Sequence, residues 1–154
     1  MQLITASLPQ HYEAAEELIK AYILFLGEDL GFQNLEDEFK NLPVMYGPPN
    51  GSLILCRTDD GKFAGMVANR NKGKNICEMK RLFVLPQYNG LGIGKTLCLR
   101  IIEMAKSSGY RFMVLDTLER LTPAIQLYQN LGFKTVAAYY DNPLSGVVYM
   151  KKEL

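Results

Sequence analysis

Three glycines at alternate positions, Gly90, Gly92 and Gly94, are the most suggestive chemical feature of this sequence, and Lys95 follows them directly. Glycine lets a backbone approach a ligand closely and lets successive N–H groups converge on one point. An apolar run precedes these residues and a helical period follows them, which predicts a turn between a buried strand and a helix N-terminus. The helix dipole favours negative charge there, so the turn suits a phosphate or pyrophosphate.

Three phosphate-binding patterns can be compared with this turn. The dinucleotide fingerprint G-x-G-x-x-G needs glycine in place of Lys95 and a βαβ unit, so we set it aside. The Walker A pattern, G-x-x-x-x-G-K-[ST], matches at its end but has Asn89 at its first glycine. The acyl-CoA pyrophosphate turn, [QR]-x-x-G-x-[GA], fits Gly92 and Gly94 but has Asn89 where Gln or Arg is usual. The turn alone leaves the second and third patterns open.

The elements around the turn favour the third pattern. Hydrophobic periodicity, caps and turn residues predict strands at 2–6, 52–57, 63–70, 76–85, 112–115, 134–138 and 146–152, and helices at 7–27, 35–42, 95–106 and 122–132. Hairpin-length connections join the three strands before the turn, which predicts an antiparallel meander. A P-loop enzyme instead places its phosphate loop after a parallel strand with a helical crossover, so Walker A becomes the less favoured interpretation.

Composition restricts the class of protein. The chain has 154 residues, which predicts one domain over 1–154, and its formal charge of +1 is spread over interspersed acids and bases. No basic field points to nucleic acid or an anionic membrane. The N-terminus lacks a signal peptide and no segment could span a bilayer, so we expect a cytoplasmic protein. Cys56, Cys77 and Cys98 are expected to be reduced core thiols, and no metal site is expected.

Two motifs together resemble the GNAT superfamily of acyl-CoA-dependent N-acyltransferases. They are the segment 78–95, which contains the glycine turn, and the segment 124–133, which contains the pattern L-Y-x-x-x-G-F. The resemblance implies an α+β fold in α/β/α layers. Its mixed, mostly antiparallel sheet would have about seven strands, would splay between the two central parallel strands and would carry about four helices. Segments 77–81 and 140–143 further resemble a group of small bacterial GNAT proteins.

The resemblance also implies a site for acetyl-CoA as co-substrate, without a metal. Backbone groups of Leu82, Phe83 and Val84 would pair with the pantetheine arm, and a backbone N–H near Phe83 or Val84 could polarise the thioester carbonyl. The turn that follows would hold the pyrophosphate through Asn89, Gly90, Leu91, Gly92, Ile93, Gly94 and Lys95.

Two residues are the candidates for proton transfer. The resemblance makes Tyr128 the general acid that protonates the departing CoA thiolate, and the alternative is that it only continues the apolar face of its helix. Glu78 stands where several amine-acetylating relatives keep a general base, and partial burial would raise its pKa toward the range that a base needs. The alternative for Glu78 is an ion pair with Lys80 or Arg70.

The expected reaction is direct attack of an amine of a small molecule or peptide on acetyl-CoA. Arg70, Glu78, Tyr140 and Asn142 could line the acceptor pocket, and an arginine there would suit an acceptor with a carboxylate. A homodimer is possible, because the C-terminal strands often dimerise in relatives. Two other functions stay open, a non-catalytic acyl-CoA-binding sensor and, less favoured, a nucleotide-binding phosphotransferase.

Overall fold

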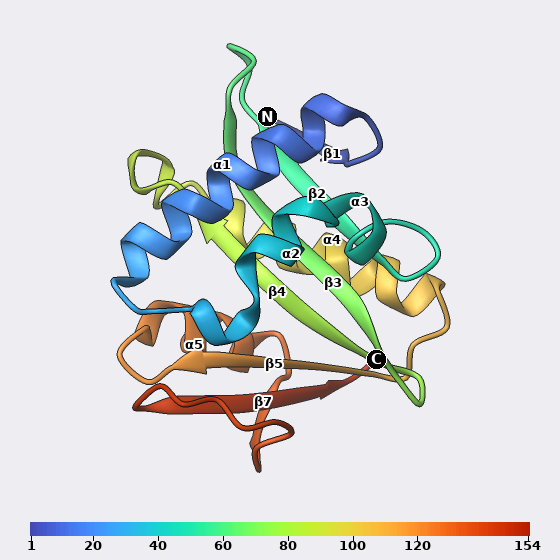
Figure 1. The fold of residues 1–154 in the computed structure, drawn as a ribbon, viewed down its shortest axis with the longest axis vertical. Coiled ribbons are helices and arrows are strands. Elements are labelled where there is room, and N and C mark those ends of the chain that lie inside the picture. The colour runs from blue at the N-terminus through green and yellow to red at the C-terminus, as the bar shows by residue number, and fades with distance from the viewer.

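The computed structural model describes residues 1–154 and has one seven-stranded sheet with helices on both faces (Figure 1). The strands are β1 (Gln2–Thr5), β2 (Gly51–Arg57), β3 (Phe63–Gly73), β4 (Ile76–Val84), β5 (Phe112–Leu118), β6 (Lys134–Val136) and β7 (Val147–Glu153). They lie in the order β1-β2-β3-β4-β5-β7-β6, and β4–β5 is the parallel pair. This architecture confirms the expected mixed, mostly antiparallel sheet.

Five α-helices are present instead of about four. They are α1 (Pro9–Leu26), α2 (Leu35–Lys40), α3 (Leu42–Met45), α4 (Ile93–Ser107) and α5 (Thr122–Asn130). The extra helix arises directly after the helix that the sequence predicts at 35–42, because Pro43 lies in the first turn of α3. Proline is tolerated there because the first turn needs no N–H donor. No helix has both the length and the apolar character needed to cross a bilayer.

The sheet separates two hydrophobic cores. In Figure 1, α1 and α2 lie in front of the sheet and α4 lies behind it. Ile19 of α1 belongs to the first core with Leu53 and Leu55 of β2, whereas Ile54 belongs to the second core with Ile101 of α4. This alternation follows from the two-residue period of a strand. The same rule places Cys77 in the second core and turns the neighbouring Glu78 to the opposite face.

The parallel strands β4 and β5 are joined at one end only. Their register contains the three pairs Ile76–Phe112, Cys77–Met113 and Glu78–Val114. Beyond these pairs β4 continues to Val84 and β5 to Leu118 without a ladder between them. The expected splay of the two central strands is therefore confirmed.

A β-bulge marks the region where β4 leaves its neighbour. Ala68 of β3 pairs with Lys80, and Met66 pairs with Phe83, so Arg81 and Leu82 together face a single residue of β3. Arg81 has φ 59°, a left-handed conformation that is uncommon for a residue with a side chain. Bulges bend a strand and redirect side chains, so this one accounts for the changed direction of β4.

Candidate active site

A cavity of about 530 Å³ lies where β4 and β5 separate. One wall is formed by β4 and the other by β5, while the glycine turn and α5 contribute further residues. The lining residues from these elements include Leu82, Phe83, Val84, Asn89, Gly90, Gly94, Leu115, Asp116, Leu118, Leu127 and Tyr128. The cavity is thus largely apolar with a few polar groups, as small-molecule sites usually are.

The glycine turn has the backbone geometry that an anion site requires. Gly90 and Gly92 have φ values of 81° and 74°, a region that favours glycine, and Gly92 immediately precedes α4. The first N–H groups of this 15-residue helix have no partner within the helix. A Cβ on Gly94 would lie 3.8 Å from Leu127 and 3.9 Å from Val84, which are ordinary contacts. The protein therefore has room for a side chain at position 94. A ligand bound against the backbone there would leave no such room.

The other predicted residues of the turn do not line this cavity. Leu91 and Lys95 are exposed, and the Ile93 side chain packs in the second core at 4% exposure. Their side chains therefore point away from the cavity wall, and only their backbone groups could contribute to an anion site.

Tyr128 lines the cavity from α5 and is 7% exposed. Its ring lies 5.8 Å from the ring of Phe133 in an edge-on arrangement, within the second core. Tyr128 therefore packs in the core, as the structural alternative expected, and also faces the cavity, while its role as general acid stays a prediction. Burial raises the pKa of Tyr128 well above its usual value, so the phenol keeps its proton at neutral pH.

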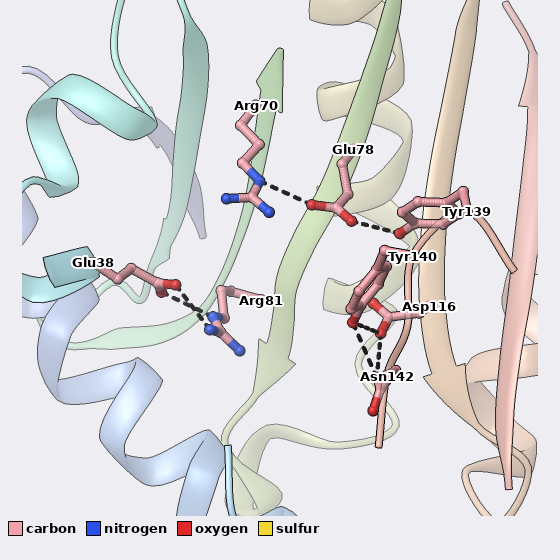
Figure 2. Close-up of polar contacts among 8 residues, drawn as sticks. All are labelled: Glu38, Arg70, Glu78, Arg81, Asp116, Tyr139, Tyr140 and Asn142. Carbon is pink, nitrogen blue, oxygen red and sulfur yellow. Dashed lines mark hydrogen bonds and ion pairs between the residues drawn. The ribbon is translucent and has the colours of Figure 1, made fainter. Parts of the chain in front are cut away.

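Glu78 is held between two partners on the front face of the sheet (Figure 2). The Nε of Arg70 donates to Oε1 at 2.9 Å, and the Tyr139 hydroxyl donates to Oε2. Burial alone would raise the pKa of Glu78, but the charges of Lys80, Arg70 and Lys72 and the Tyr139 hydrogen bond outweigh burial and lower it. The expected rise in pKa is therefore wrong, and the alternative ion pair with Arg70 is present.

Asp116 forms a second carboxylate network, beside the first in Figure 2. Its Oδ2 accepts hydrogen bonds from the Tyr140 hydroxyl and from Asn142 Nδ2, the latter at 2.8 Å. The sequence indicated Tyr140 and Asn142 but missed Asp116 and Tyr139. An acid directly after the buried run 113–115 was the available signal for Asp116, whereas nothing in the sequence shows that Tyr139 reaches Glu78.

A smaller cavity of about 290 Å³ adjoins the first and shares Gln33 and Lys80 with it. Arg70, Lys72 and Tyr140 also line it. The predicted acceptor residues are therefore divided between the two cavities: Arg70 and Tyr140 line the smaller one and Asn142 the larger one, while Glu78 lines neither.

The shared residue Lys80 carries an unpaired charge. It takes part in no ion pair, in contrast to Arg70 on the neighbouring strand. Burial, followed by the nearby charge of Arg81, lowers the pKa of Lys80 to about 8. Lys80 is therefore still mainly protonated at neutral pH, at the junction of the two cavities.

A second ion pair fixes the bulge of β4. Arg81 donates to both oxygens of Glu38 in α2, from Nε at 2.9 Å and from Nη2 at 2.8 Å (Figure 2). Burial alone would raise the pKa of Glu38, but the hydrogen bonds and charge of Arg81 outweigh it and lower this pKa. The pair ties α2 to the strand that forms the wall of the larger cavity.

Sequence comparison finds relatives along the whole chain. The model of the acetyltransferase (GNAT) family matches residues 12–133. An uncharacterized N-acetyltransferase of Schizosaccharomyces pombe is 42% identical over all of this chain and 95% of its own length. The N-acetylaspartate synthetase of Xenopus tropicalis is 31% identical over 75% of this chain but only 43% of its own length. These two relatives are eukaryotic, so they do not support the narrower expectation of a bacterial group.

Solved structures share the fold at low sequence identity. A GNAT-family acetyltransferase of Staphylococcus aureus has a TM-score of 0.80 at 18% identity, over 99% of both chains. A Bacillus anthracis protein described as a streptothricin acetyltransferase, in complex with acetyl coenzyme A, has a TM-score of 0.60 at 20% identity. That match covers 69% of this chain and 64% of the other. These structures support the fold alone, whereas the family match and the full-length relative show that the chain belongs to the GNAT family of acetyltransferases.

Proposed function

We propose that this protein transfers an acetyl group from acetyl-CoA to the primary amine of a small molecule by direct attack. The observation that carries the proposal is the one-ended pairing of β4 and β5, which opens a cavity between a glycine turn and Tyr128. Acetyl-CoA would supply an activated thioester. The B. anthracis neighbour, which was solved with acetyl coenzyme A, supports this choice of donor.

The chain offers two kinds of backbone group to the donor. The free N–H groups at the start of α4 can bind the diphosphate, where the helix dipole also favours negative charge. The part of β4 from Leu82 to Val84 has no strand partner on the side of β5, so its backbone can pair with amide groups of the pantetheine arm. Both interactions would orient the thioester without a charged side chain.

Tyr128 and water account for the protons of the reaction. The amine nitrogen bonds to the acetyl carbon, the carbon–sulfur bond breaks, and Tyr128 gives its hydroxyl proton to the sulfur. Tyr128 regains its proton from solvent before the next turnover, whereas the amine must lose one proton. Both oxygens of Glu78 already accept hydrogen bonds and its pKa is lowered, so we assign this proton to water in the cavity instead of to Glu78.

The test is CoA thiol release from acetyl-CoA with a panel of amines. We expect amine-dependent release in the wild type and a fall in kcat of about 10- to 100-fold in Tyr128→Phe, because general acids contribute about 100-fold or more and a thiolate needs less help. Tyr110→Phe is the matched control, since that hydroxyl lies outside both cavities. Tight binding of acetyl-CoA without turnover of any amine would instead indicate a non-catalytic acyl-CoA-binding protein.

A further inference from the structure

Three cationic side chains line the smaller cavity. Arg70 and Lys72 stand at alternate positions of β3, and Lys80 reaches the same cavity from β4. Glu78 accepts a hydrogen bond from Nε of Arg70, and the Nη groups of Arg70 remain available. Lys72 and Lys80 form no ion pair. Asp141 is the one acid on the cavity wall. The wall therefore carries an excess of positive charge that the protein does not neutralise.

An unsatisfied polar side chain lies at the junction of the two cavities. The Oε1 atom of Gln33 is buried without a hydrogen-bond partner, and Gln33 lines both cavities together with Lys80. A buried amide oxygen without a partner costs free energy, so such groups usually have a missing ligand or water. Gln33 Oε1 can only accept and so suits a donor such as an amine or water, whereas Lys80 suits an anionic group, and both groups lie at this junction.

The larger cavity offers a single carboxylate near the reacting centre. Asp116 lines it together with Tyr128, and its charge contributes to the raised pKa of that tyrosine. Tyr140 and Asn142 both donate to Oδ2 of Asp116, which fixes the carboxylate and leaves Oδ1 free to accept from an amine. Negative charge in one cavity and positive charge in the next would orient a ligand that carries both.

We infer that the acceptor is a dicarboxylic amino acid, with its carboxylates among Arg70, Lys72 and Lys80 and its amine near Asp116. This inference rests on the proposed function and names its substrate class. The volume of about 290 Å³ is at the lower end of ligand pockets, which run from roughly 300 to 1,000 Å³, and suits a small molecule. The name of the X. tropicalis relative, an N-acetylaspartate synthetase, agrees with this class.

The first experiment compares acceptors of equal shape. We expect kcat/KM for L-aspartate or L-glutamate to exceed that for L-asparagine and L-glutamine by roughly 100-fold, because an ionic contact with a partly buried cation is lost in the amides. L-Lysine should be a poor acceptor for the same reason. Equal or better turnover of the amides or of lysine would overturn the inference while leaving the acetyltransferase proposal intact.

The second experiment tests the cavity itself. Lys80→Met should reduce the preference for the dicarboxylic acceptor to within a few-fold, mainly through KM, and Lys80→Arg should retain most of it. Lys74→Met is the matched control, because Lys74 is exposed and lines neither cavity. Lys80→Met removes one of the charges that lower the pKa of Glu78, but Glu78 keeps its hydrogen bonds from Arg70 and Tyr139, and Lys80→Arg retains the charge.

A binding measurement separates the two proposals. Calorimetry with L-aspartate and L-glutamate needs no turnover, and at least one should bind the wild type and bind Lys80→Met at least tenfold more weakly. Binding of neither amino acid, or equal binding by the variant, would overturn the inference whatever the catalytic result. Absence of turnover with every amine despite such binding would contradict the proposed function alone.

Discussion

Two ion pairs lie near each other on β4 and use the same residue types in different surroundings (Figure 2). The Arg81 and Glu38 side chains are 3% and 1% exposed and share two hydrogen bonds. Arg70 is 31% exposed beside a Glu78 that is 2% exposed, and they share one hydrogen bond. We call them the closed pair and the open pair.

The difference shows how burial divides structural from functional roles. In the closed pair the two charges interact with each other and are shielded from water. Removal of either residue therefore leaves the other charge buried without a partner. In the open pair water can reach the free side of the guanidinium. Under the acceptor proposed above, this pair would position Arg70 for binding and contribute less to folding than the closed pair does. The following predictions test this division, from the largest expected effect to the smallest.

Glu38→Gln should lower the free energy of unfolding by about 3–5 kcal/mol, because it leaves the Arg81 charge buried without a carboxylate. Urea denaturation would measure the loss. The double variant Glu38→Met, Arg81→Met should recover most of it, since paired apolar residues remove both charges together. A loss below about 1 kcal/mol in the single variant would show that the pair is not closed.

Glu78→Gln should lower the free energy of unfolding by less than half as much, about 1–2 kcal/mol, since Arg70 remains accessible to water. Steady-state kinetics should show the acceptor KM raised about tenfold, equivalent to about 1.4 kcal/mol, with kcat little changed. A fall in kcat of about 100-fold or more at unchanged KM would contradict the positioning role and restore Glu78 as general base.

Acid should weaken both ion pairs. The folded pKa values of Glu38 and Glu78 are lowered, so their stabilisation is present above the unfolded value of about 4.3 and is lost as the pH falls through the lower folded values. The melting temperature, measured between pH 3 and 7, should therefore decrease below about pH 4. Tyr139→Phe should flatten this fall, because it removes a hydrogen bond that lowers the pKa of Glu78. An unchanged slope would contradict that role.

Alkali should act on the two cavities through Lys80. Lys80, which lies among Arg81, Glu78, Arg70 and Glu38, has its pKa lowered to about 8, so it loses its charge as the pH rises through that value. We expect succinate, a dicarboxylate without an amine, to bind a few-fold more weakly at pH 9 than at pH 7, and Lys80→Met to abolish this dependence. Calorimetry at both pH values would measure it, and pH-independent binding by the wild type would contradict the expectation.

The sequence was sufficient for the fold and for the geometry of the glycine turn, because their signals are local. Glycine spacing, an apolar strand and a helical period within 78–95 define a turn whose geometry depends on those residues alone. The acceptor side is assembled from distant segments. Glu38 and Arg81 are 43 positions apart and Tyr139 and Glu78 are 61 apart, so their pairing depends on how α2 and the segment after β6 fold back over the sheet.

The same dependence on distant segments explains why the expected rise in the pKa of Glu78 was wrong. Burial was foreseeable from a carboxylate within an apolar strand, and burial alone raises a carboxyl pKa. The three cations and the tyrosine that reverse the shift come from β3, from β4 and from the segment between β6 and β7. Their number and distance cannot be read from spacing along one strand.

The three-residue ladder between β4 and β5 has a consequence for the stability of the whole molecule. Past Glu78 and Val114 the two halves of the sheet face each other with vacant hydrogen-bonding edges. If the amides of the pantetheine arm of acetyl-CoA bound to those edges, this co-substrate would act as an exchangeable eighth strand and make the sheet continuous. The folded protein would then depend on the supply of its own co-substrate, with thermal resistance rising as donor concentration rises above its dissociation constant.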